Sequence, residues 1–438
     1  MRLKKDGLDE AGTRVAKVTR RTLANVGIAA GCGSMAASIP LIGDWTSLPN
    51  ESTFPKQMTN KPRVIVVGAG AFGGWTALHL LRGGASVTLI DTWGPGNSRS
   101  SSGGETRVIR GAYGPGQPYT RMAARSFELW REQERQWNEK LLHSIGVLWM
   151  AEDDDSFERA SLPPLKEAGI PYEELPVEEL KKRWPQINFE RVRWGIYEPH
   201  SGYLLARASC QTLVEHFVTE GGTYRQLAVS LRDNEEAVGK GVDLSDGSKL
   251  IADHYVYACG PWLGKLFPIT IGKNMLATRQ DVIFLGTPAG DARYDEGNIP
   301  VWADHRDHFM YGIPGNQNRG FKIADDTRGP EFDPTSGDRV VDRDRLEEAR
   351  RYVTFRFPGM KDAPLVETRV CQYENTPDRD YILDRHPNAA NVWIAGGGSG
   401  HGFKNGPAVG EIMAGMILAG KSADQRFQLA RFAKPAKS

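Results

Sequence analysis

The sequence is poor in cysteine and carries no excess of either charge. Its 438 residues include only four cysteines, and no two of them form a CxxC pair or join histidines at zinc spacing. We therefore expect neither a disulfide framework nor a metal site. Lys and Arg number 55 against 54 Asp and Glu, so no basic excess is available to bind a nucleic acid. The sequence also lacks internal repeats and heptads.

The N-terminal region differs in composition from the rest. Residues 1–21 carry seven Lys and Arg against three acids, and an uncharged stretch rich in Gly, Ala and Ser follows. This order, with Arg20 and Arg21 directly before the uncharged stretch, resembles a twin-arginine export signal. We predict an export signal over 1–43 and a linker over 44–61. The protein is then expected in the periplasm or the cell envelope.

Two alternatives for this region stay open, a membrane anchor and a disordered tail. The uncharged stretch is about long enough to span a bilayer, but its glycines, its serines and Pro40 weaken that interpretation. The run AAGC, which ends at Cys32, resembles a lipoprotein cleavage site without the usual large aliphatic residue. Contact with a membrane is thus expected only through a signal anchor or a lipid.

A nucleotide-binding unit begins directly after the linker. The β-branched run Arg63–Val67 is followed by GAGAFGG, a helical pattern and a second strand that ends at Asp91. In such a unit Gly68 permits the tight turn, Gly70 lets the backbone approach a pyrophosphate, and Gly73 lets helix and strand pack closely. The helix N-terminus supplies N–H donors. An acid such as Asp91 suits a ribose hydroxyl and disfavours a 2′-phosphate.

Two later segments favour FAD over NAD. Residues 253–260 form a strand that closes on a turn of small residues. Residues 391–400 form another strand, which runs into a Gly-rich turn and a helix. FAD proteins often thread the flavin domain through separated segments, whereas NAD dehydrogenases usually complete their nucleotide fold contiguously. The sequence therefore predicts FAD.

Three motifs carry a resemblance to a known family. They are SSGGETRVIRGAYGPG (101–116), RVCQYENTPDRDYILD (369–384) and GGGSGHGFK (396–404). In order and spacing they resemble the sarcosine oxidase and N-methyltryptophan oxidase family of FAD-dependent amine oxidases. The likeness runs from about Arg63 to about Gly420.

The resemblance implies an α/β fold in which a Rossmann-like FAD-binding domain is interleaved with a mixed-sheet, α+β substrate domain. The segments expected for the FAD-binding domain are 62–141, 201–275 and 366–430. Those expected for the substrate domain are 142–200 and 276–365. From its apolar spacing we also predict a charged, amphipathic helix over 129–142.

The resemblance further implies a clamp for a substrate carboxylate. The matching cations are Arg110 and Lys404, and an arginine suits this task because its planar fork can bind both oxygens. Arg107 would lie by the flavin ring, where positive charge stabilises the reduced cofactor. Tyr113 and Tyr311 match tyrosines that line the family's substrate pocket.

Two more family residues bear on the cofactor. Lys322 matches the lysine that promotes oxygen reduction, since a cation lowers the cost of forming a negative charge nearby. Cys371 stands where the family attaches FAD covalently. The residues alone would also fit a buried structural cysteine. With Arg107, Cys371 and Lys404, the other cofactor contacts expected are Ala71, Phe72, Ser101, Ser102, Thr106, Val229, Gly260, Trp262, Gly400, His401, Gly402 and Phe403.

The sequence departs from the family pattern at two places. Ser102 and Gly103 stand where the family has a pair of histidines, and Asp326 falls on another active-site histidine by spacing. The Asp326 carboxylate and the Gly103 hydrogen, in place of imidazole rings, change both the volume and the charge of the site. We therefore hypothesise a substrate that is larger or more basic than sarcosine.

Taken together, the sequence predicts an oxidase for an amino acid or an N-alkyl amino acid. Hydride would pass from the substrate to the flavin, and O2 would be reduced to hydrogen peroxide. One alternative is a dehydrogenase of the same fold that passes electrons to a quinone or a carrier protein. A second is a flavin-binding protein without turnover. The partners expected are a small amine and O2, with no nucleic acid; monomer and dimer both remain open.

Overall fold

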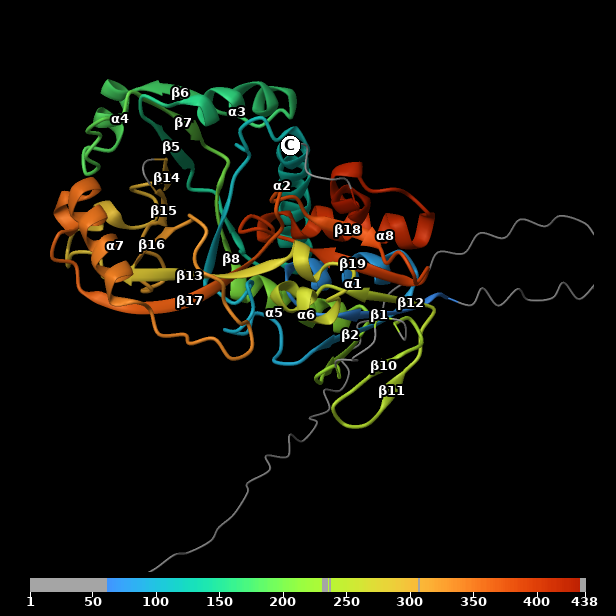
Figure 1. Ribbon diagram of the computed structural model, residues 1–438. Coiled ribbons are helices and arrows are strands. Elements are labelled where there is room, and N and C mark those ends of the chain that lie inside the picture. Colours follow the sequence, from blue (N-terminus) through green and yellow to red (C-terminus); the bar gives the residue numbers. More distant parts are fainter. Residues whose placement is uncertain (1–60, 231–234, 236–237, 306–307, 434–438) are drawn as a thin grey trace, which may run out of the picture. The chain divides into compact units, whose positions relative to one another are not determined.

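The computed structural model describes residues 61–230, 235, 238–305 and 308–433 (Figure 1). The predicted export signal and linker lie outside these residues, apart from Lys61. Within the described part, no helix is long and apolar enough to cross a membrane.

The nucleotide-binding motif opens a six-stranded sheet. Its order is β18-β19-β12-β1-β2-β9, in which β18 alone is antiparallel to its neighbour. The four inner strands are rich in buried apolar residues, as expected where helices cover both faces of a parallel sheet. The strands are β1 (Arg63–Val67), β2 (Ser86–Asp91), β9 (Thr223–Gln226), β12 (His254–Tyr257), β18 (Ile382–Arg385) and β19 (Val392–Gly396).

Two helices from opposite ends of the chain pack closely beside this sheet. They are α1 (Ala71–Arg82) and α8 (Gly406–Ala419). A Cβ on Gly410 of α8 would lie 2.6 Å from the carbonyl oxygen of Trp75 in α1, so only a glycine permits this approach. The Trp75 ring in turn stacks on that of Trp137.

Three further helices accompany the six-stranded sheet. They are α2 (Gln117–Trp137), α5 (Ala206–Thr219) and α6 (Leu263–Leu266). The helix predicted over 129–142 is therefore wrong in its limits, since α2 begins twelve residues earlier. Pro118 occupies its first turn, where a missing N–H costs nothing. Asn138 ends it in the left-handed conformation, with φ of 54°.

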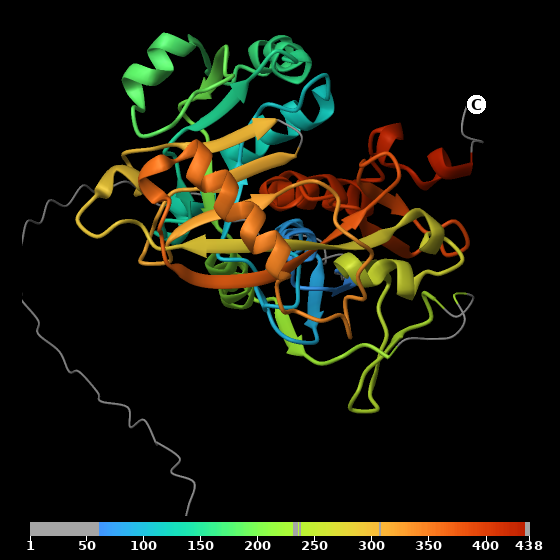
Figure 2. The ribbon, with the colours of Figure 1, turned by 60° about the vertical axis from the view of Figure 1, so that its left-hand side comes forward.

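An eight-stranded mixed sheet forms the other half of the described part (Figure 1). Its order is β17-β13-β16-β15-β14-β5-β7-β6, and only β14 and β5 pair in parallel. The strands are β5 (Val147–Ala151), β6 (Glu173–Pro176), β7 (Trp194–Glu198), β13 (Leu276–Leu285), β14 (Val301–His305), β15 (Phe309–Ile313), β16 (Phe321–Asp325) and β17 (Leu365–Asn375). The helices beside it are α3 (Ser156–Glu167), α4 (Val177–Arg183) and α7 (Arg343–Arg356). Figure 2 shows α7 lying across the sheet.

Strand β17 crosses a predicted domain boundary. We placed the start of the last FAD-binding segment at residue 366, but β17 pairs with β13 along its whole length and so belongs to the eight-stranded sheet. The sequence signal is weak here because β17 is half-buried and lacks strict alternation. The remaining strands form two small sheets. One has the order β3 (Thr106–Ile109), β8 (Gly202–Leu205) and β4 (Leu142–His143), and the other pairs β10 (Val242–Asp243) with β11 (Lys249–Leu250).

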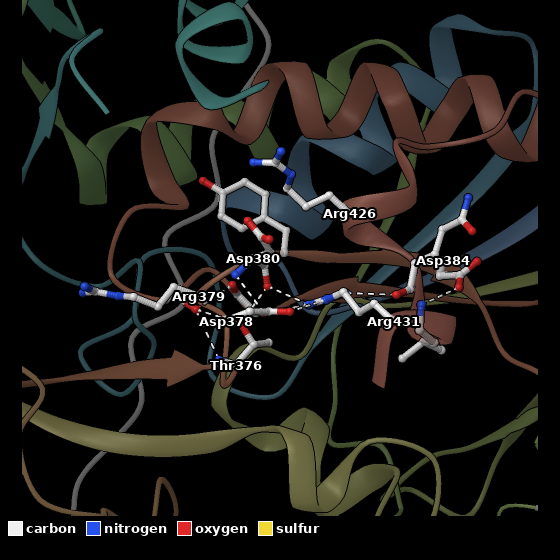
Figure 3. Close-up of polar contacts among 12 residues, drawn as sticks. Thr376, Asp378, Arg379, Asp380, Asp384, Arg426 and Arg431 are labelled. Carbon is white, nitrogen blue, oxygen red and sulfur yellow. Dashed lines mark hydrogen bonds and ion pairs between the residues drawn. The ribbon is translucent and has the colours of Figure 1, made fainter. Parts of the chain in front are cut away.

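Ion pairs fix the loop between β17 and β18. Arg431 Nε lies 2.8 Å from Asp378 Oδ2, and Asp384 Oδ2 accepts a hydrogen bond from the Leu429 backbone N–H. Figure 3 shows these contacts, with the Arg379 side chain pointing away from the Asp378–Arg431 pair. The C-terminal 3-10 turn η8 (Leu429–Ala433), which follows η7 (Gln425–Phe427), thereby holds this loop in place. The other 3-10 turns are η2 (Gly260–Trp262), η3 (Gly272–Asn274), η4 (Ala292–Tyr294), η5 (Pro358–Met360) and η6 (Phe403–Asn405).

Candidate functional site

A cavity of about 340 Å³ lies at the carboxyl ends of the parallel strands. Residues that follow β1, β2, β12 and β19 line it. β1 has β2 on one side and β12 on the other, so the chain changes direction across the sheet at this point. Open α/β sheets bind their ligands at such a switch point.

The Gly-rich turn after β1 has the form needed for a pyrophosphate. Gly68 has φ of +105°, and a Cβ on it would lie 2.3 Å from the Ala258 carbonyl oxygen. A Cβ on Gly73 would lie 1.8 Å from the Gly68 oxygen, so this glycine allows the helix to pack and does not itself line the cavity. Helix α1 begins at Ala71 without a side-chain cap, and its N-terminus borders the cavity.

Asp91 also holds the turn. Its Oδ2 accepts a hydrogen bond from the Ala69 N–H at 2.9 Å, while Oδ1 accepts from the N–H groups of Trp93 and Gly94. Burial raises the pKa of Asp91, against the effect of these three donors. The carboxylate lines the cavity, as a ribose-binding acid should. In addition it orders the backbone on either side, a role not anticipated from the sequence.

Most of the predicted cofactor contacts line this cavity. They are Gly68, Gly70, Ala71, Phe72, Asp91, Ser101, Ser102, Arg107, Val229, Gly260, Trp262, Gly400, Gly402 and Phe403. Gly73, Thr106, Cys371, His401 and Lys404 do not. The glycine cradle, the uncapped helix N-terminus and the acid after β2 fit the pyrophosphate and ribose of FAD.

A second cavity of about 60 Å³ adjoins the first. Arg107, Tyr373, Gly400 and Phe403 line both, which marks the end of the large cavity where a flavin ring would meet a substrate. Four predicted residues line the small cavity besides Arg107: Arg110, Tyr311, His401 and Lys404. Tyr113 and Lys322 do not line the small cavity but contact residues that do. Tyr113 contacts Arg110 and Lys404, and Lys322 lies beside the Tyr311 ring.

Arg110 and Lys404 share one aromatic environment. The Arg110 guanidinium carbon lies 4.3 Å from the centre of the Tyr113 ring and 4.8 Å from that of Trp149. Lys404 Nζ donates to Tyr113 Oη at 3.2 Å and to the His401 carbonyl at 3.1 Å. Burial, and then the charge of Arg110, hold the pKa of Lys404 well below its usual range. An anion bound between these two cations would restore the positive charge of Lys404.

A buried acid fixes the backbone next to Arg110. Glu198 is fully buried and accepts hydrogen bonds from the N–H groups of Gly111 and Ala112, at 2.6 and 3.1 Å. The indole N–H of Trp149 donates to the same carboxylate at 2.9 Å. Glu198 therefore positions both the turn that carries Arg110 and the ring beside it. The sequence analysis missed this residue, whose only local signal is an acid that ends an apolar strand.

Arg107, Lys322 and Cys371 form a second group of contacts. Arg107 Nη2 lies 3.2 Å from Cys371 Sγ and 2.7 Å from the Ser101 carbonyl oxygen. Lys322 is 1% exposed, and its Nζ donates to the Thr106 carbonyl at 2.8 Å. Burial, followed by the charge of Arg107, places the pKa of Lys322 well below its usual range. A negative charge that arises nearby would be stabilised by protonated Lys322.

Asp326 is the one carboxylate among the described residues that line the small cavity. Its Oδ1 accepts a hydrogen bond from Tyr373 Oη at 2.7 Å. Burial raises the pKa of Asp326, although the Tyr373 hydroxyl and nearby cations oppose this. The pocket thus presents cations and one acid to the same small ligand. Tyr373, which no sequence argument singled out, holds the acid and borders both cavities.

One trio outside these cavities has ligands of the kind that bind metals. His308, Asp325 and Glu348 place one ligand atom each within 4.8 Å of one another. Arg345 lies 3.0 Å from Glu348 and 3.7 Å from Asp325, so its charge already balances these acids. We therefore assign no metal to this trio.

Comparisons with known proteins agree with this geometry. The family model described as FAD dependent oxidoreductase (DAO) matches residues 63–416. A monomeric sarcosine oxidase of Bacillus sp. (strain B-0618) is 30% identical over 364 residues, which covers 82% of this chain and 93% of that protein. An N-methyl-L-tryptophan oxidase of Yersinia pestis (strain Pestoides F) is 28% identical over 381 residues, which covers 84% and 99%.

Solved structures show the same fold. The structure of L-proline dehydrogenase from P. horikoshii has a TM-score of 0.74 at 23% identity and covers 85% of this chain and 98% of that one. A fructosyl peptide oxidase from E. terrenum has a TM-score of 0.71 at 20% identity and covers 84% and 92%. The predicted α/β architecture is thereby confirmed.

Proposed function

The chain belongs to the family of FAD-dependent oxidoreductases, and from this premise we propose that it oxidises the C–N bond of an amino acid or an N-alkyl amino acid. One observation carries the proposal: Arg110 and Lys404 face a small cavity at the ring end of the FAD cavity. The similarity to enzymes named sarcosine oxidase and N-methyl-L-tryptophan oxidase supports the same chemistry. Bleaching of the flavin absorbance by amino acids without oxygen tests it.

The mechanism follows from what each side chain can hold. Arg110 and Lys404 bind the substrate carboxylate, and the carboxylate in turn keeps Lys404 protonated despite its burial. Tyr113 fixes the Lys404 ammonium, while Trp149 limits the position of the Arg110 guanidinium. The bound FAD would supply an acceptor for the hydride that leaves the substrate Cα, once the substrate nitrogen has lost its ammonium proton to solvent. The imine product then leaves and is hydrolysed.

We also propose that O2 is the electron acceptor and that hydrogen peroxide is formed. Lys322 supports this choice over a quinone or a carrier protein, because its buried amino group lies behind the small cavity, where a nearby negative charge would favour its protonated form. Its Nζ lies 5.7 Å from the centre of the Tyr311 ring, one of the rings that line this cavity.

Cys371 is proposed to bind FAD covalently through the 8α-methyl group of its ring. The support is the matched motif and the position of its Sγ, which lies 3.2 Å from Arg107 Nη2. Cys371 does not line the large cavity itself, but its neighbour Tyr373 on the same face of β17 does.

Replacing Cys371 with alanine should abolish acid-stable yellow colour. The wild-type protein, precipitated with acid, is expected to keep its flavin in the pellet, and the variant should release it into the supernatant. Cys210, which is buried near the same site, provides the control, since Cys210→Ala should keep the flavin. Release of flavin from the wild-type pellet would remove Cys371 from this role.

The small cavity has consequences for the substrate. A water molecule needs about 10–15 Å³ on this measure, so 60 Å³ has room for roughly five waters or for an amino acid of similar size. Of the two substrate properties hypothesised, this volume disfavours a large substrate, while the Asp326 carboxylate favours a positively charged group. We propose that the Asp326 carboxylate binds the substrate ammonium opposite the Arg110–Lys404 pair.

Replacing Asp326 with asparagine should raise KM for the amine about tenfold, the effect expected when one partner of a half-buried ion pair is lost. The affinity for acetate, which has a carboxylate and no amine, should stay at the wild-type value or increase. The neighbouring Asp325 faces the other side of the sheet, so Asp325→Asn is the matched control. Equal weakening of the amine and of acetate would contradict this role.

We further propose that residues 1–43 direct export by a twin-arginine route and that 44–61 link the signal to the enzyme. This system moves folded proteins, which allows FAD to be bound inside the cell before transport. Cleavage of the signal, its retention as an anchor and lipidation of Cys32 are alternative fates of the same segment.

A further inference from the structure

Glu374 is a buried carboxyl group in the wall of the FAD cavity that no motif assigns. It lies on β17, its side chain is 8% exposed, and its Oε1 accepts a hydrogen bond from the Gly398 N–H at 3.1 Å. Its Oε2 is buried and has no hydrogen-bond partner in the described part of the chain. Proteins rarely leave such an oxygen without a donor, so a missing partner is expected.

Two glycines of the cavity wall lie beside the Glu374 carboxyl group. Gly260 has φ of +52°, and a Cβ on it would lie 3.0 Å from Oε2. A Cβ on Gly398 would lie 3.1 Å from Oε1. Any larger residue at either position would crowd the carboxyl group, and both glycines line the cavity themselves.

The position of Glu374 indicates which part of FAD would lie beside it. Tyr373, its neighbour in sequence, borders both cavities and marks the ring end. The turn at Gly68 and Gly70 marks the pyrophosphate end, and Gly260 follows β12, the strand next to β1. In FAD the chain between ring and pyrophosphate is the ribityl group, whose hydroxyls are hydrogen-bond donors. We propose that Glu374 Oε2 accepts a hydrogen bond from a ribityl hydroxyl and so is a further FAD-binding residue.

This contact makes FAD binding sensitive to pH. Burial raises the pKa of Glu374 to about 7 in the protein without a ligand, and the Gly398 N–H opposes this. The titratable groups nearest in sequence and packing are Tyr373 and Cys259, both kept neutral by pKa values that burial raises. A hydroxyl donor favours the ionised carboxylate and lowers its pKa. Below pH 7 a proton must therefore leave when FAD binds, and affinity falls as the pH falls.

The test measures FAD affinity and needs no turnover, so it stands apart from the choice of substrate. A full-length Cys371→Ala protein makes binding reversible, and Kd is measured by quenching of flavin fluorescence. We expect affinity to fall about tenfold between pH 7.5 and pH 5.5 in this background. Adding Glu374→Gln should remove the pH dependence. Adding Glu374→Met should weaken binding about tenfold at pH 7.5.

Two comparisons sharpen the result. Glu367→Gln, at a half-exposed position on the outer half of β17, should leave affinity and pH dependence unchanged. Glu374→Met should weaken the binding of riboflavin but not that of lumiflavin, which has the ring and lacks the ribityl hydroxyls. An equal loss of affinity for lumiflavin and for riboflavin in Glu374→Met would overturn the proposal. If the Glu374 variants do not fold, an FAD affinity of the Cys371→Ala protein that does not change with pH is enough by itself to overturn the proposal.

Discussion

Replacing Arg110 with methionine should lower kcat/KM for amino-acid substrates by roughly 30- to 5,000-fold. Loss of one partner from a desolvated charge pair costs about 2–5 kcal/mol, and the substrate carboxylate would be left facing Lys404 alone. Arg110→Lys should recover only part of the loss, because an ammonium group cannot bind both carboxylate oxygens as a planar fork does.

Steady-state kinetics with a carboxylate substrate and with its methyl ester measure this effect. The ester should react poorly with the wild-type enzyme and lose little more in the variant. Arg121 on α2 lies in an exposed ion pair with Glu167, so Arg121→Met is the matched control and should behave as wild type. A similar loss for ester and acid would show that Arg110 supports the fold and does not bind the carboxylate.

Replacing Lys322 with methionine should slow the reaction with oxygen by about 10²- to 10³-fold. Two charges about 4 Å apart interact by about 4 kcal/mol at an effective dielectric constant of 20, which corresponds to a factor near 10³. Methionine keeps the length of the side chain without its charge. The anaerobic reduction of the flavin by substrate should change little, since Lys322 lies behind the substrate cavity.

Stopped-flow mixing of the reduced variant with aerated buffer measures the oxygen reaction by itself. Lys265 on α6 is an exposed lysine paired with Asp333, and Lys265→Met should reoxidise at the wild-type rate. An unchanged rate in Lys322→Met, together with fast transfer to a quinone, would favour the dehydrogenase alternative.

The parts of the fold that local chemistry determines were predictable. The strand–turn–helix around Gly68 and Gly70 was placed within a few residues. Both the β-branched run and the glycines that the turn requires can be recognised in the sequence. The limits of α2 were placed too late, although Tyr119, Met122, Ala123 and Phe127 already follow the apolar spacing of a helix before residue 129. The pairing of β17 with β13 could not be predicted either, because it joins residues far apart in the chain.

The candidate site divides in the same way. Arg110 and Lys404 come from motifs nearly 300 residues apart, and the structure brings them to one cavity. Glu198 and Tyr373 act through hydrogen bonds to neighbours, and such positioning residues have no pattern of their own in a single sequence. The unpartnered oxygen of Glu374 is a property of packing alone. The sequence could therefore single out the groups proposed to react, but not the residues that hold them.

The central claim is that this chain oxidises amino acids or N-alkyl amino acids with bound FAD. The most direct test is anaerobic titration of the purified holoenzyme with a panel of small amino acids and N-methyl amino acids, followed by admission of oxygen. At least one zwitterionic amine should bleach the flavin absorbance, oxygen should restore it, and hydrogen peroxide should form in equal amount. Flavin that stays oxidised with every amine of the panel would contradict the account.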